Sequence, residues 1–430
     1  MVEKFSKWGI YAIVFGLPLY LIRFEILGVP TTVLEIMIYI LFTVWLVGGF
    51  NLSEFIKIIK ENRLLFVAIF LILLGVSLAT IRSWDLRLSA GILKAWFFDP
   101  VLFFIVFISV IKREEETRKV FYALMLSGVV VSIASLIYLF LGELNIDGRL
   151  QGFYNSPNYL AMYLAPAFIV VFSCCFLAFF VRPGEASSGL SLSLVPINRD
   201  IVPASGLKTR SKTTLKHIAF IVGCFLLAMT IFFTKSFGAW MGVVGAIGFG
   251  LVAWFLKAKK KKIAVVLTIL LIILCVGIYF IKFSSAQGRL SINSRLEIWQ
   301  RAIDAVVMYP IIGIGPGTFK DFFPEDPDWS VPQPHNLYLA FVLQTGIIGF
   351  IGFILLLIWF FNTGFKLLKI QSSSLPVASY LLLVMMVYIL IHGLVDTTYW
   401  KNDLAVMFWM IIGMMAFIKT RSKIKYQNVK

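Results

Sequence analysis

Long apolar runs alternate with short polar segments along nearly the whole chain. Each run holds about 16–24 residues, which is enough for an α-helix to cross the hydrocarbon core of a bilayer, and about twelve runs are present. They lie near residues 8–22, 31–49, 64–81, 96–111, 120–141, 158–181, 217–233, 237–256, 263–281, 337–361, 377–395 and 404–418. The pattern predicts an all-α polytopic membrane protein with about twelve transmembrane helices and no soluble domain of ordinary size.

One long polar segment interrupts this pattern. Residues 282–336 are rich in Arg, Asp, Glu, Pro and Gly. A segment this polar cannot enter lipid, so it must lie on one face of the membrane or line a cavity. It divides the chain into residues 1–281, with the first nine predicted spans, and residues 337–430, with the last three spans and a tail. We expect the polar segment to carry the chemistry.

The basic residues are unevenly distributed between the two sides of the membrane. The chain has a net charge of +17, and 27 of its 39 Lys and Arg residues fall in the alternate segments that begin with the N-terminus. By the positive-inside rule these segments are cytoplasmic, so both termini should be cytoplasmic and residues 282–336 should lie on the outer face. The basic blocks lack interleaved aromatic residues, which argues against a nucleic-acid partner. Among the cytoplasmic segments, 182–216 is predicted to be a flexible loop and 257–262 a cluster that meets anionic lipid head groups.

The composition does not indicate a metal or cofactor site. The four cysteines lie in apolar runs without metal-ligand spacing, and we expect buried thiols that act as small apolar residues. They are Cys174, Cys175, Cys224 and Cys275. Asp326-Pro327-Asp328 has the spacing of a carboxylate pair in metal-dependent glycosyl transfer. The intervening proline and the neighbouring acids favour a solvated surface instead, so we predict no metal and no cofactor.

The polar segment is predicted to contain an amphipathic helix. Ser294 and Glu297 fit a capping box, so a helix should begin at Ser294, and Pro310 should end it near Met308. One face is apolar and the other polar, as expected for a helix on the membrane surface or against the bundle. The apolar face comprises Trp299, Ala302, Ile303 and Val306, and the polar face Gln300, Arg301 and Asp304.

Arg295 would then lie in the first turn of this helix, beside backbone N–H groups without an intrahelical partner. A guanidinium there opposes the helix dipole unless an anion binds at the same place. Arg289 lies six residues earlier and could reach the same anion. A diphosphate is the natural candidate, because the Arg fork matches phosphate oxygens.

Two further cations are expected at the outer margin of the membrane. Arg149 lies in the turn-rich segment 148–158, which contains Gly, Pro and Asn residues and ends at Asn158. Contact with lipid head groups alone would also explain Arg149. Lys235 is the only charge in the short turn 233–238. A functional role and an exception to the charge bias explain Lys235 equally well.

Histidine is rare in the chain, which contains three. His217 begins a span on the cytoplasmic side and is interpreted as structural. His335 opens the tenth span directly after the polar segment, together with Asn336, and this place makes it a candidate general base with a pKa near neutral. Taken alone, His335 is better explained as a structural residue. His392, close to Asp396 in the chain, is a weaker second candidate.

Several of these segments together resemble the O-antigen ligase and polymerase superfamily of bacterial envelope glycosyltransferases. The matching pieces are RLQGFYNSPNYLA from Arg149, TKSFGAW from Thr234, SRLEIWQRA followed by YPIIGIGPGTF in the polar segment, and PHNLYLAFVLQTGIIG from Pro334. Their order, with about twelve spans and one large outer loop, covers most of the chain.

The resemblance implies transfer of a glycan from an undecaprenyl diphosphate carrier to an acceptor hydroxyl, such as that of lipid A-core, on the outer face of the bacterial inner membrane without a metal. It also implies that His335 is the catalytic base and that Arg295 holds the diphosphate. Together with the reading of the outer loops, the expected diphosphate-binding residues are Arg295, Arg289, Arg149 and Lys235, with Asn336 and Asn158 in support.

Two positions depart from the family pattern, and several functions stay open. Phe237 stands where an Arg is usual, and Gln344 stands where Glu is frequent. The first departure removes one diphosphate contact unless Lys235 supplies it, and the second removes a possible acid–base partner. A polymerase of lipid-linked repeat units and a protein O-oligosaccharyltransferase share the architecture. A flippase of lipid-linked sugar would instead require charged or broken helices at mid-membrane and repeat symmetry.

Overall fold

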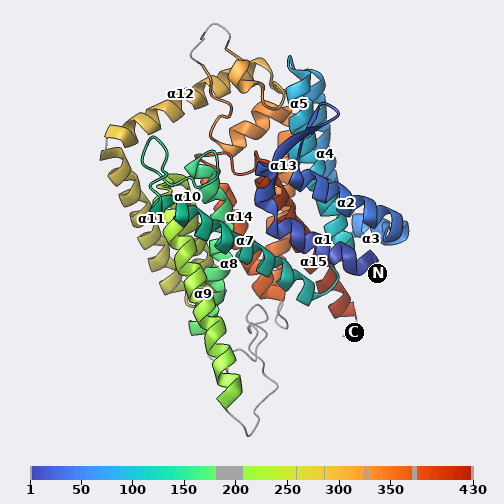
Figure 1. The fold of residues 1–430 in the computed structure, drawn as a ribbon, viewed down its shortest axis with the longest axis vertical. Coiled ribbons are helices and arrows are strands. Elements are labelled where there is room, and N and C mark those ends of the chain that lie inside the picture. Colours follow the sequence, from blue (N-terminus) through green and yellow to red (C-terminus); the bar gives the residue numbers. More distant parts are fainter. Residues whose placement is uncertain are drawn as a thin grey trace.

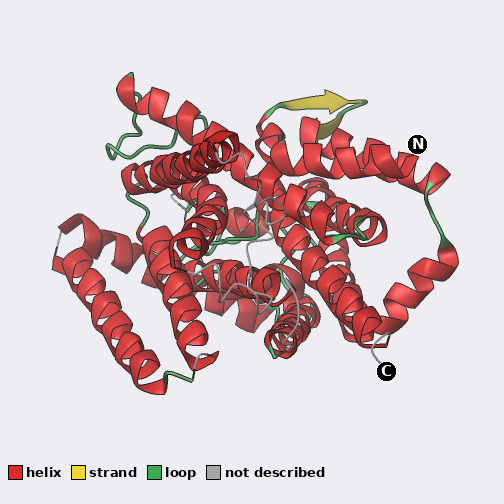
Figure 2. Cartoon of the chain, turned by 90° about the horizontal axis from the view of Figure 1, so that it is seen from below, coloured by secondary structure: helices red, strands yellow, loops and turns green. Residues whose placement is uncertain are grey.

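The computed structural model describes residues 2–180, 207–257, 259–284, 286–323, 326, 329–369 and 375–427. Residues 182–206 of the predicted cytoplasmic loop, and Pro327 and Asp328 of the acidic pair, lie outside the described residues. The rest is mostly helical, with one β-hairpin (Figure 2). In chain order the α-helices are α1 (Val2–Phe15), α2 (Val33–Gly48), α3 (Leu52–Glu61), α4 (Arg63–Ile81), α5 (Leu86–Leu93), α6 (Asp99–Val110), α7 (Glu114–Phe140), α8 (Pro157–Phe180), α9 (Leu207–Phe233), α10 (Phe237–Lys257), α11 (Lys261–Ser284), α12 (Ala286–Met308), α13 (Leu337–Leu368), α14 (Leu375–His392) and α15 (Asn402–Gln427).

Short elements connect several of these helices. Strands β1 (Arg23–Ile26) and β2 (Val29–Thr32) form an antiparallel hairpin between α1 and α2. Lys94–Phe98 is a π-helical turn between α5 and α6, and Leu17–Leu21 and Thr318–Asp321 are 3-10 turns. Four helices begin at a polar side chain that accepts a hydrogen bond from a backbone N–H of the first turn, which satisfies donors that otherwise lack a partner. These residues are Thr32, Asn51, Asp85 and Asn336.

Every predicted span overlaps at least one helix, but fewer of these helices have the length and composition needed to cross a membrane. By length and composition, seven of the described helices can span a bilayer, or eight if α2 and α3, bent by 114°, form one span. The helical membrane architecture is therefore confirmed, and the count of about twelve stays a prediction. Among the candidate spans α15 is the most buried within the protein, because 89% of the residues in its most apolar stretch are buried.

Helices α4 and α13 pack backbone to backbone. A Cβ added at Gly75 would lie 2.3 Å from the backbone nitrogen of Gly349, and one added at Gly352 would lie 2.7 Å from that of Ile72. Small residues permit such close crossings between membrane helices, where van der Waals contact replaces the hydrophobic effect as the driving force. Helices α4 and α13 are therefore a closely packed pair within the bundle.

Helix α13 is broken in its first half, and the polar segment fills the break. Gly346 has φ 64° and ψ −177°, which interrupts the helix. Around this residue Ile347 N donates to Pro310 O at 3.0 Å, and Ile314 N donates to Leu343 O at 2.8 Å. Backbone groups at membrane depth need such partners, because lipid supplies none. The turn after α12 is thus docked into α13 by main-chain hydrogen bonds.

The glycines of the GIGPG turn serve this docking. Gly313, Gly315 and Gly317 all have positive φ, between 80° and 91°. A Cβ on Gly313 would lie 2.6 Å from Leu343 O, and one on Gly315 would lie 2.8 Å from the side chain of Ser83. Their lack of a side chain lets the turn lie against α13 and α4.

The observed start of α12 differs from the predicted one. It begins at Ala286 rather than Ser294, and it ends at Met308 as predicted. The Ser-x-x-Glu pattern gave a wrong start because serine also occurs inside helices, where its hydroxyl donates a hydrogen bond to the carbonyl four residues earlier. Here Ser294 Oγ donates to Leu290 O at 2.9 Å. Arg295 is therefore in the middle of α12, and the argument from free N–H groups of a first turn does not apply.

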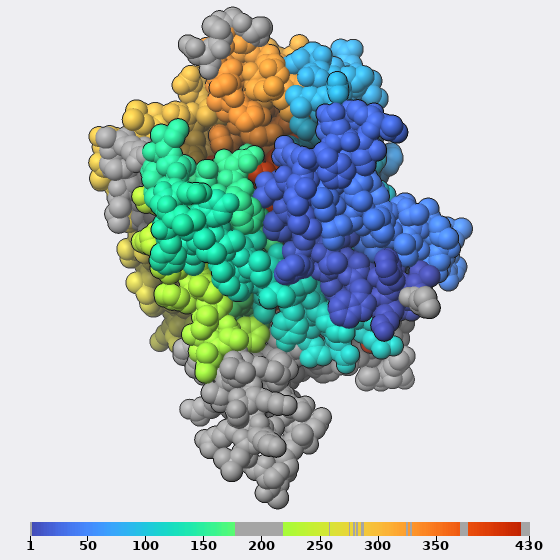
Figure 3. Space-filling model, viewed as in Figure 1, coloured from blue at the N-terminus to red at the C-terminus, as the bar shows by residue number. Residues whose placement is uncertain are grey.

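Helix α12 lies across one end of the bundle, at the top of Figure 1. Its apolar face packs on α13 and the following turn, and it differs in part from the predicted face because Ile303 is exposed. The buried members are Ile298, Ala302 and Ala305, with Trp299 and Val306 packed beside them. At this end α5 and the described part of residues 300–323 lie side by side (Figure 3), joined by a hydrogen bond of 2.8 Å from Ser89 Oγ to Pro316 O.

Candidate functional site

A single buried carboxylate connects distant parts of the chain. Asp396 lies in the loop between α14 and α15 and is 2% exposed. Its Oδ1 lies 3.2 Å from His335 Nδ1 and accepts a hydrogen bond of 2.9 Å from Thr397 N. Its Oδ2 accepts a bond of 2.9 Å from Asn158 Nδ2, at the start of α8. The start of α8, the start of α13 and the α14–α15 loop are thereby held together.

The environment of Asp396 keeps it ionised. Burial by itself raises the pKa of a carboxyl group, but the hydrogen bond and charge of His335, the charge of His392 and the backbone N–H of Thr397 together lower the pKa of Asp396 to about 2. The carboxylate is then an acceptor only, so His335 Nδ1 must carry the proton that it shares with Asp396.

His335 is held in an unusual backbone conformation. Its φ is 46°, a left-handed value that costs free energy for a residue with a side chain. The next residue, Asn336, fixes the start of α13. Its Oδ1 accepts hydrogen bonds of 3.0 Å from Tyr338 N and Leu339 N, and its Nδ2 donates to Leu394 O at 3.0 Å.

The imidazole of His335 is positioned to accept a proton. Its side chain is 35% exposed, in contrast to the buried Asp396 beneath it. With Nδ1–H directed at the carboxylate, Nε2 is the basic nitrogen, and no residue that the structure describes forms a hydrogen bond with it. A carboxylate that orients a partly exposed imidazole in this way is the arrangement of a general base with its positioning group.

Arg149 is attached to the same network through Asn158. Its Nη2 donates to Asn158 Oδ1 at 2.6 Å, and its Nε donates to Thr234 O at 2.8 Å, just beyond the end of α9. Burial lowers the pKa of Arg149, and the positive charge of Arg295 lowers it further. Both guanidinium groups remain charged at neutral pH. Because the charge of Arg295 acts on Arg149, the two groups lie close enough to repel each other.

Arg295 approaches the network from α12. Its Nε donates to Val395 O at 3.2 Å, beside Asp396, and its Nη1 donates to Ser291 Oγ at 2.5 Å and to Ser291 O at 3.1 Å. Among the described residues neither guanidinium forms an ion pair with a carboxylate, and two such neighbouring groups favour binding of a multivalent anion.

The other two predicted cations, Lys235 and Arg289, differ in their distance from the group around Asp396. Lys235, with φ 48°, occupies the turn between α9 and α10, and its Nζ lies 4.0 Å from the place where a Cβ would stand on Gly148, next to Arg149. Arg289 is exposed and donates to Phe283 O and Ser284 O at 3.2 and 2.9 Å, at the corner between α11 and α12. No contact of the described residues joins Arg289 to the group around Asp396.

Asp396 itself was not among the predicted site residues. The available signal was an acid near His392 at the end of an apolar run, and it was interpreted only as a neighbour of that histidine. His392 is 1% exposed, and its Nδ1 lies 2.7 Å from the hydroxyl of Tyr388. Its ring also packs on Gly238, where an added Cβ would lie 2.5 Å from Cδ2. These contacts describe a residue of the protein interior.

The two departures from the family pattern have different structural settings. The amide of Gln344 is buried, accepts a hydrogen bond of 2.9 Å from Gly317 N and donates to Gln333 Oε1 at 2.7 Å. It therefore fixes the turn that docks into α13. Phe237 is the first residue of α10. Among the residues that the structure describes, no cluster of His, Cys, Asp and Glu is arranged to hold a metal ion.

Comparison with known proteins gives one family match. Residues 222–354 match the family model described as O-antigen ligase (Wzy_C). The matched region contains Lys235, Arg295 and His335, whereas Arg149, Asn158 and Asp396 lie outside it. No curated protein matches the chain at a significant level.

Proposed function

We propose that this chain, whose residues 222–354 match the O-antigen ligase family, is a glycosyltransferase of that family and transfers a glycan from undecaprenyl diphosphate to an acceptor hydroxyl. The proposed acceptor is lipid A-core or a similar envelope molecule, and the proposed site faces the outer side of the inner membrane, with both termini in the cytoplasm. The carrying observation is the contact of His335 with Asp396 beside Arg149 and Arg295.

In the proposed reaction the acceptor oxygen attacks the anomeric carbon as the bond from that carbon to the diphosphate oxygen breaks. Nε2 of His335 takes the hydroxyl proton, and Asp396 stabilises the imidazolium that results. Negative charge grows on the leaving diphosphate, where Arg149 and Arg295 can stabilise it in a partly desolvated place. Lys235 adds a third positive charge beside Arg149. A single displacement predicts inversion at the anomeric carbon, which product NMR would test.

The remaining predicted residues have supporting places in this proposal. Asn158 connects Arg149 to Asp396, and Asn336 fixes the helix start that carries His335. Arg289 would have to leave the α11–α12 corner to reach the same anion. Since positive charge is supplied by side chains, we propose that the reaction proceeds without a metal.

A reconstituted transfer assay tests the proposal. Purified protein in liposomes would receive a carrier-linked glycan and lipid A-core in the presence of EDTA, as wild type, His335→Ala and Arg295→Ala. The control is Lys320→Ala, which removes an exposed cation from the same polar segment. We expect glycan-bearing lipid A-core from wild type and control, and a loss of about 10²–10⁴ in rate for His335→Ala.

Other outcomes would identify a different activity. Lengthening of the carrier-linked chain without transfer to lipid A-core would indicate a polymerase, and glycan attached to a protein acceptor would indicate an O-oligosaccharyltransferase. Movement of carrier-linked glycan between leaflets without any transfer would refute the enzymatic proposal in favour of a flippase.

A further inference from the structure

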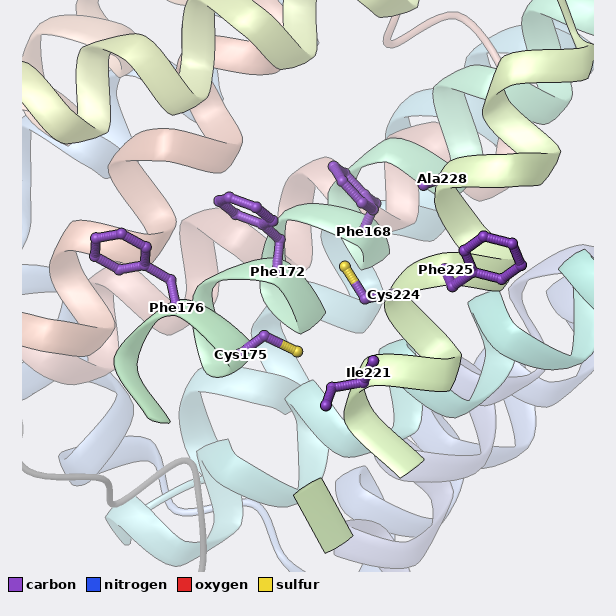
Figure 4. A pocket seen from close by; sticks show the side chains of 8 residues that line it. All are labelled: Phe168, Phe172, Cys175, Phe176, Ile221, Cys224, Phe225 and Ala228. Atoms are coloured by element: carbon purple, nitrogen blue, oxygen red, sulfur yellow. The ribbon is translucent and has the colours of Figure 1, made fainter. Parts of the chain in front are cut away.

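An apolar groove runs between α8 and α9 (Figure 4). It has a volume of about 460 Å³ and an almost wholly apolar lining. Phe168 and Phe172 contribute from α8, and Phe225 and Ala228 contribute from α9. Cys175 of α8 and Cys224 of α9 also line the groove, and their side chains lie between the two helices.

The groove lies below the cationic part of the proposed site, along the same two helices. Arg149 bridges their ends, since its guanidinium donates to Asn158 at the start of α8 and to Thr234 just after α9. At a rise of 1.5 Å per residue, Phe168 is about 15 Å along α8 from Asn158, and Ala228 is about 8 Å along α9 from Phe233. A guanidinium therefore lies at one end of the contact between α8 and α9, and the apolar groove lies further along the same two helices.

This combination matches an amphiphile with an anionic head and a long apolar tail. A head held by Arg149 and Arg295 would direct its tail along the two helices toward the groove. Aromatic side chains provide large apolar contact areas for such a tail. A bilayer phospholipid could also enter the groove, but its head group would lie at the membrane surface independently of the two guanidinium groups.

We propose that the groove between α8 and α9 binds the polyprenyl tail of the lipid-linked donor. The inference rests on the proposed function for the identity of the donor, and it adds the part of the protein that recognises the carrier rather than the glycan. Tail binding there would hold the diphosphate next to Arg149 and contribute to affinity in proportion to the apolar area that is buried.

Photolabelling tests the location directly and does not require turnover. Protein in liposomes would be irradiated with a polyprenyl diphosphate that carries a diazirine in its tail, and labelled peptides would be identified by mass spectrometry. We expect labels in residues 168–176 and 221–228, suppressed by excess unlabelled polyprenyl diphosphate and not by excess phospholipid. Labels elsewhere, or equal suppression by phospholipid, would overturn the proposal.

A matched pair of variants tests the consequence for transfer. Ala228→Phe fills the groove, whereas Val130→Phe adds the same ring at an exposed, lipid-facing position of α7. With a long-tail donor we expect the KM of Ala228→Phe to rise about tenfold, and with a short-tail donor we expect both variants to equal wild type. An unchanged KM of Ala228→Phe for the long-tail donor would contradict tail binding in the groove. If wild type transfers from neither donor, the proposed function fails, and the photolabelling result still decides the groove.

Discussion

Replacement of Asp396 by Asn keeps the shape of the side chain and removes its charge and one of its acceptors. The carboxylate meets three N–H donors, from His335, Thr397 and Asn158. An amide has one oxygen and one NH₂ group, so at least one of the three donors must face NH₂ whichever way the amide is turned. The substitution therefore leaves a buried donor without an acceptor.

Either orientation of the new amide weakens the site. If its NH₂ group faces Asn158, that side chain must turn and lose the oxygen that binds Arg149. If its NH₂ group faces His335, it donates to Nδ1, and the ring proton moves to Nε2, which can no longer act as a base. A hydrogen bond to a charged group contributes about 1.5–3 kcal/mol. At about 1.4 kcal/mol per tenfold change in rate, we expect kcat to fall about 10- to 150-fold.

The assay is the initial rate of transfer at saturating donor, measured for Asp396→Asn, His335→Ala and the double variant. Asp304→Asn, an exposed carboxylate on α12, is the control for the same chemical change. If Asp396 acts by positioning His335, the substitution should change the rate of the His335→Ala variant by less than about twofold. Full activity of Asp396→Asn, or an equal loss in both backgrounds, would refute the reasoning.

Three further predictions follow from the geometry. Arg295→Ala should lower the transfer rate about 10- to 150-fold by removing the proposed charge-assisted contact with the diphosphate. A rate within about twofold of wild type in the liposome assay would contradict the proposed role of Arg295. Gly346→Ala should lower the melting temperature, because the new Cβ would lie 2.1 Å from Ile311 O at a backbone φ of 64°. The control Gly277→Ala, whose new Cβ has nothing within 4 Å, should leave the melting temperature unchanged. Equal melting temperatures of the two variants would contradict the requirement for glycine at the break in α13. Because the pKa of Asp396 is lowered to about 2 from its ordinary 3.8, its charge should stabilise the fold fully above about pH 4, and this contribution should be lost as the pH falls through about 2. Thermal melts of wild type and Asp396→Asn against pH would show a constant difference if this assignment is wrong.

The sequence predicted the helices well because their signal is local. Each apolar run of membrane-spanning length overlaps a helix, and Pro310 correctly predicted the end of α12 at Met308. The short helices α3 and α5 lie outside these runs and were not predicted. The start of α12 was wrong because the same Ser-x-x-Glu pattern is compatible with a helix interior. The number of helices that cross the membrane depends on lengths and bends that composition alone does not fix.

The candidate site was predicted in part. His335, Asn158 and Arg149 were each selected from their own loops, and the structure brings them into one network with Arg295. Asp396 was missed because its importance comes from contacts with residues 61 and 238 positions away in the chain. Such contacts depend on the packing of whole helices, for which a single sequence carries no periodic signal.

The broken helix α13 has a practical consequence for exchanging parts between related proteins. The segment from Tyr309 to Gly317 supplies backbone partners to α13 on both sides of Gly346, so neither piece is complete without the other. A chimaera that replaces the polar loop alone would leave main-chain groups of α13 without these hydrogen-bond partners. Exchanges between related proteins should therefore transfer residues 309–347 as one unit and place their crossover points outside it.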